Sequence, residues 1–265
     1  MRVTYRNRDV EAYWRDRWSS IPVDEPMINK DVYPLKYVEM AMGQSPEPIL
    51  EAGCGNGRIL RHLASRGLDV QGMDFISEAV NKLHAADPSL NVRVGDIREL
   101  DFENDTFGTL LAFGLYHNLD KGLNHAIRES HRVLKPGGRI CASFRADNLH
   151  NRLSDWYADR ARTDSDSKTQ TFHKLNLNRS EVTDLFHRNG FNVDAVFPVQ
   201  NMSILYKLSA FRRGDQKRFD ENRARAAGYQ LSIVGAWIQF ALMHCIPNQW
   251  CNVFVLIGTK KDEDE

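Results

Sequence analysis

The chain has 265 residues, of which 42% are hydrophobic and 26% charged, so it is long enough for one soluble α/β domain with additions. Lys plus Arg and Asp plus Glu number 35 each, and this zero net charge argues against a dedicated nucleic-acid-binding protein, which usually carries a basic surplus. The sequence has only four cysteines and no Cys-x-x-Cys pair, which excludes a disulfide-rich secreted scaffold. Its N-terminal stretch is charged and does not resemble a signal peptide, so we expect a cytoplasmic protein.

Helical patterns at residues 7–18 and about 31–42 predict an N-terminal helical cover over residues 1–44. From residue 45 onward, short apolar runs alternate with amphipathic stretches. The runs predict strands at 48–54, 69–75, 91–97, 107–114 and 139–144, and the stretches predict helices at 58–67, 77–88 and 119–138. Ser77 is expected to cap the second of these helices, and Pro136 with two glycines to end the third. This alternation predicts a mostly parallel sheet with helices on both faces and a ligand crevice at the C-terminal ends of the strands.

Beyond residue 145 the alternation is interrupted. A Ser/Thr/Asp-rich stretch at 163–171 predicts a loop, residues 178–191 a helix, and residues 192–199 and 251–261 two further strands. Between those strands we expect a helical insertion at about 203–248, within a domain that extends from 45 to 265. Its first half is basic (Lys207, Arg212, Arg213, Lys217, Arg218, Arg223, Arg225) and its second half is nearly free of charge. Three interpretations stand: a lid over the substrate, a helix buried against the sheet or in a dimer interface, and a peripheral membrane contact through residues 207–246.

The stretch ILEAGCGNGR, residues 49–58, places Gly53, Gly55 and Gly57 directly after a predicted strand. A dinucleotide-binding loop has the pattern G-x-G-x-x-G, and Arg58 stands where its third glycine belongs. No Gly-Lys-Ser/Thr follows, so the phosphate-binding P-loop pattern is also absent. The loop therefore predicts close approach of a ligand to the backbone without identifying that ligand.

Acidic residues near the same edge of the sheet narrow the choice of ligand. Asp74 ends the second predicted strand, 19 residues after Gly55, where a carboxylate can accept both hydroxyls of a ribose. Asp96 ends the third strand and is placed to accept from an adenine amino group, while Glu51 and the glycine backbone suit an aminoacyl tail. A ligand with a ribose, an adenine and an aminoacyl tail but no phosphate is S-adenosylmethionine.

In these motifs the chain resembles the class I S-adenosylmethionine-dependent methyltransferases, in particular their small-molecule type 11 group. The resemblance rests on ILEAGCGNGR, VQGMDF, VRVGDIREL, FGTLLAFGLYHNL and HRVLKPGGRI within residues 45–145, and on FNVDAVFPV and CNVFVLIGTKK near the end. It implies S-adenosylmethionine as cofactor. It also implies an α/β fold with a Rossmann-like, doubly wound, seven-stranded sheet that is mostly parallel and has an antiparallel last strand.

The resemblance further implies which residues contact the cofactor. The methionine part is expected on the glycine loop, the ribose at Asp74, the adenine near Phe75 and Asp96, and the sulfonium near the end of the fourth strand. An N-terminal aromatic helix is expected over the cofactor, although its tryptophans could instead dock the helix on the sheet. The residues concerned are Glu51, Gly53, Cys54, Gly55, Asn56, Gly57, Asp74, Phe75, Ile76, Asp96, Ile97, Phe113, Gly114, Trp14 and Trp18.

For catalysis, the resemblance points to His117, just past the fourth strand, as a general base. The alternative is a structural histidine that hydrogen-bonds the backbone at the strand end. Tyr116, Arg145 and His173 are candidate substrate contacts, and His173 could instead lie in a surface loop. The histidines and cysteines lack metal-ligand spacing, so no metal is expected.

The sequence thus predicts in-line methyl transfer to an O, N or C atom of a small molecule, lipid-like and prenyl-linked acceptors included. Three alternatives are a non-catalytic S-adenosylmethionine-binding scaffold or sensor, an RNA or protein methyltransferase, and a dehydrogenase, against which Arg58 counts. We expect a monomer or homodimer with a small-molecule substrate rather than nucleic acid, in the cytoplasm or at the membrane periphery.

Overall fold

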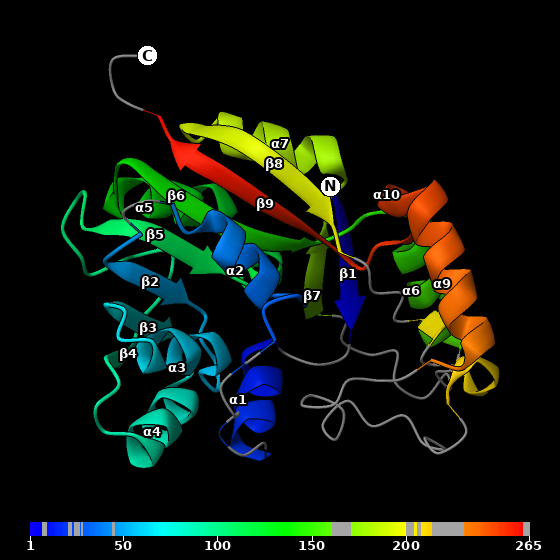
Figure 1. Ribbon diagram of the computed structural model, residues 1–265, viewed down its shortest axis with the longest axis horizontal. Helices are drawn as coiled ribbons and strands as arrows, with labels where there is room; N and C mark the ends of the chain where they lie inside the picture. Colours follow the sequence, from blue (N-terminus) through cyan, green and yellow to red (C-terminus); the bar gives the residue numbers. More distant parts are fainter. Residues whose placement is uncertain are drawn as a thin grey trace.

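The computed structural model describes residues 1–6, 10–20, 23, 27, 29–43, 46–160, 171–199, 204–205, 208–213 and 231–261. Its centre is a seven-stranded sheet with strand order β4-β3-β2-β5-β6-β9-β8 (Figure 1). The strands are β2 (Ile49–Ala52), β3 (Val70–Asp74), β4 (Val92–Val94), β5 (Phe107–Ala112), β6 (Leu134–Arg145), β8 (Phe191–Pro198) and β9 (Val253–Lys260). Neighbouring strands are parallel except that β9 runs antiparallel to β6 and to β8, which confirms the predicted fold.

Side chains of the central strands fill a hydrophobic core on each side of this sheet. Leu110 and Leu111 of β5 are both fully buried but belong to opposite cores, because successive residues of a strand point to opposite faces. Helices α5 (Leu123–Val133), α7 (Arg179–His187) and α9 (Ile233–Cys245) contribute side chains to the core on the side of Leu110. Three pack on the side of Leu111, α2 (Leu35–Ala41), α3 (Arg58–Ser65) and α4 (Ser77–Ala86). The predicted layering, with helices on both faces, is therefore confirmed.

Two predicted helix boundaries are wrong. Ser77 does not cap α4; it is the first helical residue, its hydroxyl donates to Glu78, and Ile76 stands at the cap position without a side-chain bond. The turn before α4 is held by Asp74 instead, whose carboxylate accepts the Ile76 N–H. The helix expected at 119–138 is α5, and it ends at Val133 because Leu134 already pairs with Phe107 as the first residue of β6.

Three elements of the structure were not predicted. β1 (Arg2–Arg6) and β7 (Thr171–Asn176) form an antiparallel two-stranded sheet that joins the N-terminus to the far half of the chain. α6 (Leu149–Arg160) follows β6 directly. The N-terminal region is therefore a strand followed by α1 (Val10–Ser20), and not a purely helical cover.

The insertion before β9 contains the 3₁₀ turn Ser209–Phe211, α9 (Ile233–Cys245) and the short α10 (Pro247–Trp250). Among the predicted features, the loop at 163–170, the basic residues Lys207, Lys217, Arg218, Arg223 and Arg225, and the tail after residue 261 lie outside the described residues. Within the described ranges, every helix is too short or too polar to cross a membrane.

Two glycines at the ends of α3 have the same backbone conformation but different surroundings. Gly57 and Gly67 both have φ of +76°, yet a Cβ on Gly57 would lie 2.6 Å from Cδ2 of the buried Leu83, whereas one on Gly67 would meet nothing within 4 Å. We expect Gly57→Ala to lower the free energy of unfolding by about 1–2 kcal/mol more than Gly67→Ala, since only the former adds an overpacked methyl group. Urea denaturation of both variants measures the difference, and equal losses would contradict it.

Candidate cofactor and active site

One cavity of about 580 Å³ opens at the C-terminal ends of β2, β3, β4 and β5, where the fold predicts a ligand crevice. Of the residues predicted to contact the cofactor, all but Gly57 line it. Gly57 instead begins α3 behind the loop. The sequence-predicted residues that line the cavity are Glu51, Gly53, Cys54, Gly55, Asn56, Asp74, Phe75, Ile76, Asp96, Ile97, Phe113, Gly114, Trp14 and Trp18.

The glycine loop is tied to the neighbouring strand by its own backbone. The N–H groups of Gly53 and Cys54 both donate to the carbonyl oxygen of Met73, at 2.7 and 3.0 Å. Gly55 has a φ of +53°, and a Cβ there would lie 2.7 Å from Cζ2 of Trp18. Glycine is therefore required at this position both by the backbone conformation and by the indole ring that packs against it.

Asp74, at the end of β3, connects the glycine loop to the start of α4. Its Oδ2 accepts the Gly55 N–H at 2.8 Å and its Oδ1 accepts the Ile76 N–H at 2.9 Å. Burial raises the pKa of this carboxyl group, and the two backbone donors oppose that rise. Each carboxylate oxygen can accept a second hydrogen bond, so the side chain retains acceptor capacity toward the cavity.

Glu51, inside β2, is a buried carboxyl group in the wall of the cavity. Burial raises its pKa to about 8, against the opposing effects of the Leu60 N–H and of Arg58. Oε2 accepts that Leu60 N–H at 2.7 Å. Arg58 also lines the cavity, at the first position of α3, so a carboxyl group and a guanidinium face the same space.

Asp96, after β4, is already held by its neighbour Arg98. The guanidinium of Arg98 donates to both carboxylate oxygens, with Nη2 2.6 Å from Oδ2, and its backbone N–H donates to Oδ1 at 2.8 Å. Burial raises the pKa of Asp96, but the bonds from Arg98 outweigh that effect and the pKa lies below its usual value. This pairing was not predicted, and it fixes the carboxylate at the rim.

Helix α1 covers the cavity with two stacked indole rings. The ring centroids of Trp14 and Trp18 lie 5.4 Å apart with the planes 24° from parallel. The C-terminal end of the helix is anchored by Lys82 of α4, whose Nζ donates to the carbonyl oxygens of Trp18 and Ser19 at 2.7 Å each. The tryptophans thus both dock the helix and face the ligand space, so the two alternatives for them do not exclude each other.

The predicted base and substrate contacts lie outside the lining of this cavity. His117 is buried beneath it, with Nδ1 3.4 Å from the carbonyl oxygen of Ser143, and burial lowers its pKa to about 3. Tyr116 is fully buried and its hydroxyl pairs with Ser130 Oγ at 2.6 Å. His173 lies half-buried in β7, not in a surface loop.

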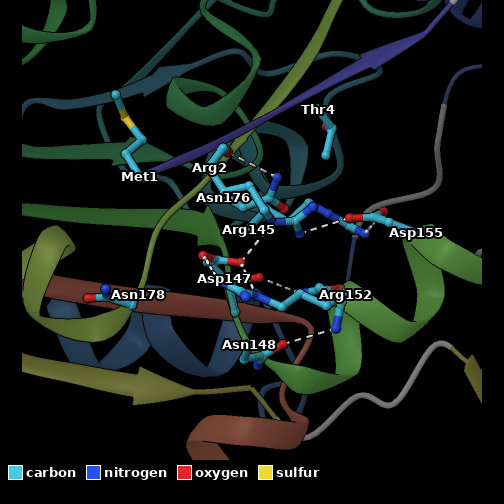
Figure 2. A network of polar contacts seen from close by, with 12 residues as sticks. Met1, Arg2, Thr4, Arg145, Asp147, Asn148, Arg152, Asp155, Asn176 and Asn178 are labelled. Atoms are coloured by element: carbon cyan, nitrogen blue, oxygen red, sulfur yellow. Dashed lines mark hydrogen bonds and ion pairs between the residues drawn. The ribbon is translucent and has the colours of Figure 1, made fainter.

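Arg145 belongs to a network of ion pairs that joins β1 to α6 (Figure 2). Its Nη2 lies 3.1 Å from Oδ1 of Asp155, whose other oxygen is 2.8 Å from Arg2 Nη2. Arg2 also contacts Asp147, at 2.8 Å. The Asp155 carboxylate of α6 therefore occupies the guanidinium that was a candidate for substrate binding.

Several lining residues were missed by sequence reasoning. They come from α1, from the turn before α2 and from the turn after β5, and they are Val10, Glu11, Arg17, Tyr33, Leu115, Asn118, Leu119 and Asp120. The last four follow a predicted strand tip, which was an available signal. Tyr33 has no such signal; it is brought to the site by its hydrogen bond to Ser143 Oγ, at 3.1 Å, and by edge-on packing against Phe113, with ring centroids 5.8 Å apart.

The carboxyl groups that line the cavity suit the hydroxyl and amino groups of an adenosyl and aminoacyl ligand better than they suit a phosphate. The carboxyl groups of Glu51, Asp74 and Asp96 line the cavity on the side of the glycine loop. At Gly114 a Cβ would meet nothing within 4 Å, so the wall of the cavity is open there. Within the described part of the chain, no group of three or more His, Cys, Asp and Glu residues could hold a metal ion. The fold and this lining are those expected of a Rossmann-like domain that binds a nucleoside.

Comparison with known proteins makes the assignment specific. Residues 49–138 match the family model of a methyltransferase domain. An uncharacterised methyltransferase of Mycobacterium tuberculosis (strain H37Rv) is 32% identical over 108 residues, 41% of this chain and 44% of that protein. An S-adenosyl-L-methionine-dependent Diels-Alderase of Talaromyces variabilis is 25% identical over 243 residues, 82% of this chain and 80% of that protein. A solved S-adenosylmethionine-dependent methyltransferase of Methanosarcina mazei superposes with a TM-score of 0.56 at 21% identity, covering 88% of this chain and 99% of the other.

Residues 49–138 therefore carry a methyltransferase domain, in agreement with the class I S-adenosylmethionine-dependent methyltransferases that the sequence motifs resemble. S-adenosylmethionine, the cofactor that the motifs predict, is also named for similar proteins of Mycolicibacterium smegmatis and Haemonchus contortus. The chain spans only 44% of the length of the mycobacterial relative, so the reaction and substrate of the whole protein are proposals.

Proposed function

We propose that this protein transfers the methyl group of S-adenosylmethionine to a small molecule. The observation that carries the proposal is that one continuous cavity joins the cofactor-binding residues to a second group of lining residues, after β5 and on α1. That second group includes the apolar side chains Val10, Leu115 and Leu119 beside the carboxylates of Glu11 and Asp120. This composition supports an acceptor with both an apolar body and a polar end, such as a lipid-like molecule.

The chain's own residues can orient the cofactor from three sides. We assign the ammonium of the aminoacyl tail to Glu51 and its carboxylate to Arg58, the ribose to Asp74, and the adenine to the exposed face of Phe75 next to Asp96. When bound, S-adenosylmethionine supplies a methyl group already activated by a sulfonium. The residues then need mainly to align the acceptor and exclude water, and the indole of Trp14 or Trp18 offers a face that attracts a cation.

A second candidate function is catalysis that uses the bound cofactor without transferring its methyl group. It is favoured by the similarity to the Talaromyces Diels-Alderase, which extends over most of both chains. The two functions differ in their products, because only methyl transfer converts the cofactor into S-adenosylhomocysteine.

Two measurements test the proposal in order. Calorimetric titration with S-adenosylhomocysteine and with NAD checks the cofactor, and binding of NAD alone would overturn it. A screen of small-molecule pools with methyl-labelled cofactor then looks for label in a product. Turnover of an acceptor with the cofactor recovered intact would favour the second function over methyl transfer.

His117 provides a test of whether the transfer uses a buried base. A histidine with a pKa near 3 is uncharged at neutral pH and is a weak base, and its contact with the Ser143 carbonyl, to which Nδ1–H donates, supports a structural role. We expect His117→Asn to leave turnover within about threefold of the wild type and to lower stability by about 1 kcal/mol, the value of one buried hydrogen bond. A loss of turnover above about 100-fold with unchanged cofactor affinity would restore the role of general base.

A further inference from the structure

The exposed apolar side chains of this molecule are concentrated in one place. Of the fifteen large hydrophobic side chains that are exposed in the described part of the chain, nine lie on α6, on α9 and at the turn between α9 and α10. They are Leu149, Leu153, Trp156, Tyr157, Ile233, Val234, Trp237, Phe240 and Ile246, and we refer to them as the α6–α9 apolar surface. Figure 1 shows both helices at the right-hand end of the molecule, away from α3 and α4 beside the cofactor cavity.

Helix α6 is turned the opposite way from an ordinary surface helix. Its buried residues are the polar His150, Asn151 and Ser154, while Trp156 is 56% exposed and Leu149 is 45% exposed. A surface helix normally directs its apolar stripe toward the core and its polar stripe toward water.

Hydrogen bonds to the backbone hold α6 in this orientation. The side-chain amide of Asn151 donates to the carbonyl oxygens of Ala146 and Asn252, at 2.7 and 2.8 Å. The amide of Asn148, just before the helix, donates to the carbonyl oxygens of Asn248 and Cys251, at 2.9 and 2.8 Å. Rolling the helix to hide its apolar face would break these four hydrogen bonds of the Asn148 and Asn151 amides, which is costly for buried groups.

Helix α9 adds a second exposed apolar face to the same end of the molecule. Only Gly235 and Met243 are buried in this helix, while Trp237 is 67% exposed and packs edge-on against Phe240. Both α6 and α9 pack against α10, which links the two faces. No residue of α9 lines the cofactor cavity.

The described part of this surface carries a cation, Arg160, and part of the neighbouring sequence is basic. The guanidinium of Arg160 lies over the ring of Trp156, 4.6 Å from its centroid. The acidic residues of α6 face the other way, since Asp155 pairs with Arg2 and Arg145, and Asp159 lines a polar hollow with β1. In the sequence, residues 207–225 carry seven Lys and Arg against three Asp and Glu, and residues 226–259 then carry none of these four types.

We infer that the α6–α9 apolar surface docks this protein on an anionic lipid bilayer, with both helices lying in the interface. Exposed apolar side chains that include two tryptophans and a tyrosine, with basic residues in the preceding sequence, are the features that bind helices to anionic membrane surfaces. Neither helix crosses the bilayer in this arrangement. The inference goes beyond the proposed function and does not depend on methyl transfer.

Co-sedimentation with vesicles tests the inference on the full chain. We expect binding to vesicles of phosphatidylcholine and phosphatidylglycerol in equal parts, weak binding to phosphatidylcholine alone, and weakening by added salt. The double variant Trp156→Ser/Trp237→Ser should bind the anionic vesicles roughly tenfold or more weakly, because two large apolar groups are lost. The matched control Met40→Ser/Val94→Ser removes two exposed apolar groups elsewhere and should bind like the wild type.

Titration of each variant with S-adenosylhomocysteine shows whether it remains folded, since both tryptophans of the variant lie outside the cofactor cavity. Three results would overturn the inference: no sedimentation with anionic vesicles, equal sedimentation with neutral ones, or sedimentation that the tryptophan variant leaves unchanged. Light scattering provides a fourth. A wild-type dimer that becomes a monomer in the tryptophan variant would mean that a second copy of the chain covers this surface.

Discussion

Replacing Asp74 by alanine is expected to lower the affinity for S-adenosylhomocysteine by roughly 100-fold, about 3 kcal/mol. The carboxylate is assigned to the ribose hydroxyls, and a charge-assisted hydrogen bond contributes about 1.5–3 kcal/mol. The structure adds a second reason, because the same carboxylate holds the N–H groups of Gly55 and Ile76 at 2.8 and 2.9 Å. The variant therefore loses both a ligand contact and the anchor of the glycine loop. Titration calorimetry at fixed pH measures the loss.

Two further variants separate these contributions. Asp87→Ala removes a half-buried carboxylate at the end of α4, outside the cavity, and should bind like the wild type. Asp74→Asn retains one acceptor oxygen and should lose less affinity than Asp74→Ala. An Asp74→Ala protein that binds with wild-type affinity would show that the ribose lies elsewhere.

Replacing Glu51 by glutamine is expected to abolish a pH dependence of cofactor affinity. Burial raises the pKa of Glu51 to about 8 in the free protein, so the group is largely protonated at pH 7. An ammonium group beside it favours the carboxylate, and binding then releases a proton. Affinity for S-adenosylhomocysteine should therefore rise with pH, by up to about tenfold per unit between pH 6 and 8, and level off above. In Glu51→Gln the slope disappears, and at pH 8 the affinity falls roughly tenfold or more.

The same group makes the free protein less stable in alkaline solution. A raised folded-state pKa means that the neutral form is favoured by folding, so this contribution to stability is complete below the ordinary value of 4.5 and is lost as the pH rises through about 8. Thermal unfolding without ligand should show a decline from pH 6 to 9 that is smaller in Glu51→Gln. Glu103→Gln, an exposed site, controls for the change in net charge. Identical pH profiles for the wild type and Glu51→Gln would contradict both expectations.

The cofactor half of the site was predictable because it depends on local sequence. Glycines that follow a buried strand and acids that end the next two strands reach the same edge of any parallel sheet, so Gly55, Asp74 and Asp96 could be placed together before the structure was known. The side chains that pair with or pack against these three residues could not be predicted. Sequence does not show that Arg98 folds back on Asp96, or that Trp18 packs on Gly55.

The acceptor half was predicted poorly because distant contacts decide it. His117 and Arg145 sit at strand ends, which is where substrate contacts are expected, yet packing of β7 and α6 encloses the first and pairs the second with Asp155. Helix α6 was not predicted because its pattern of buried residues is unusual. Its buried stripe is polar, so the apolar periodicity that reveals a surface helix points away from the core.

The pairing of β1 with β7 has a consequence for the order of events during synthesis. Thr171 Oγ donates to the carbonyl oxygen of Arg6, across 165 residues of chain. At translation rates of about 5–20 residues per second, the first strand waits roughly 8–33 s for its partner to be made. Over that interval the strands β2 to β6 emerge and can assemble. Strand β1 is consequently secured only after most of the large sheet has been made, whereas α1 can already be held by Lys82 of α4.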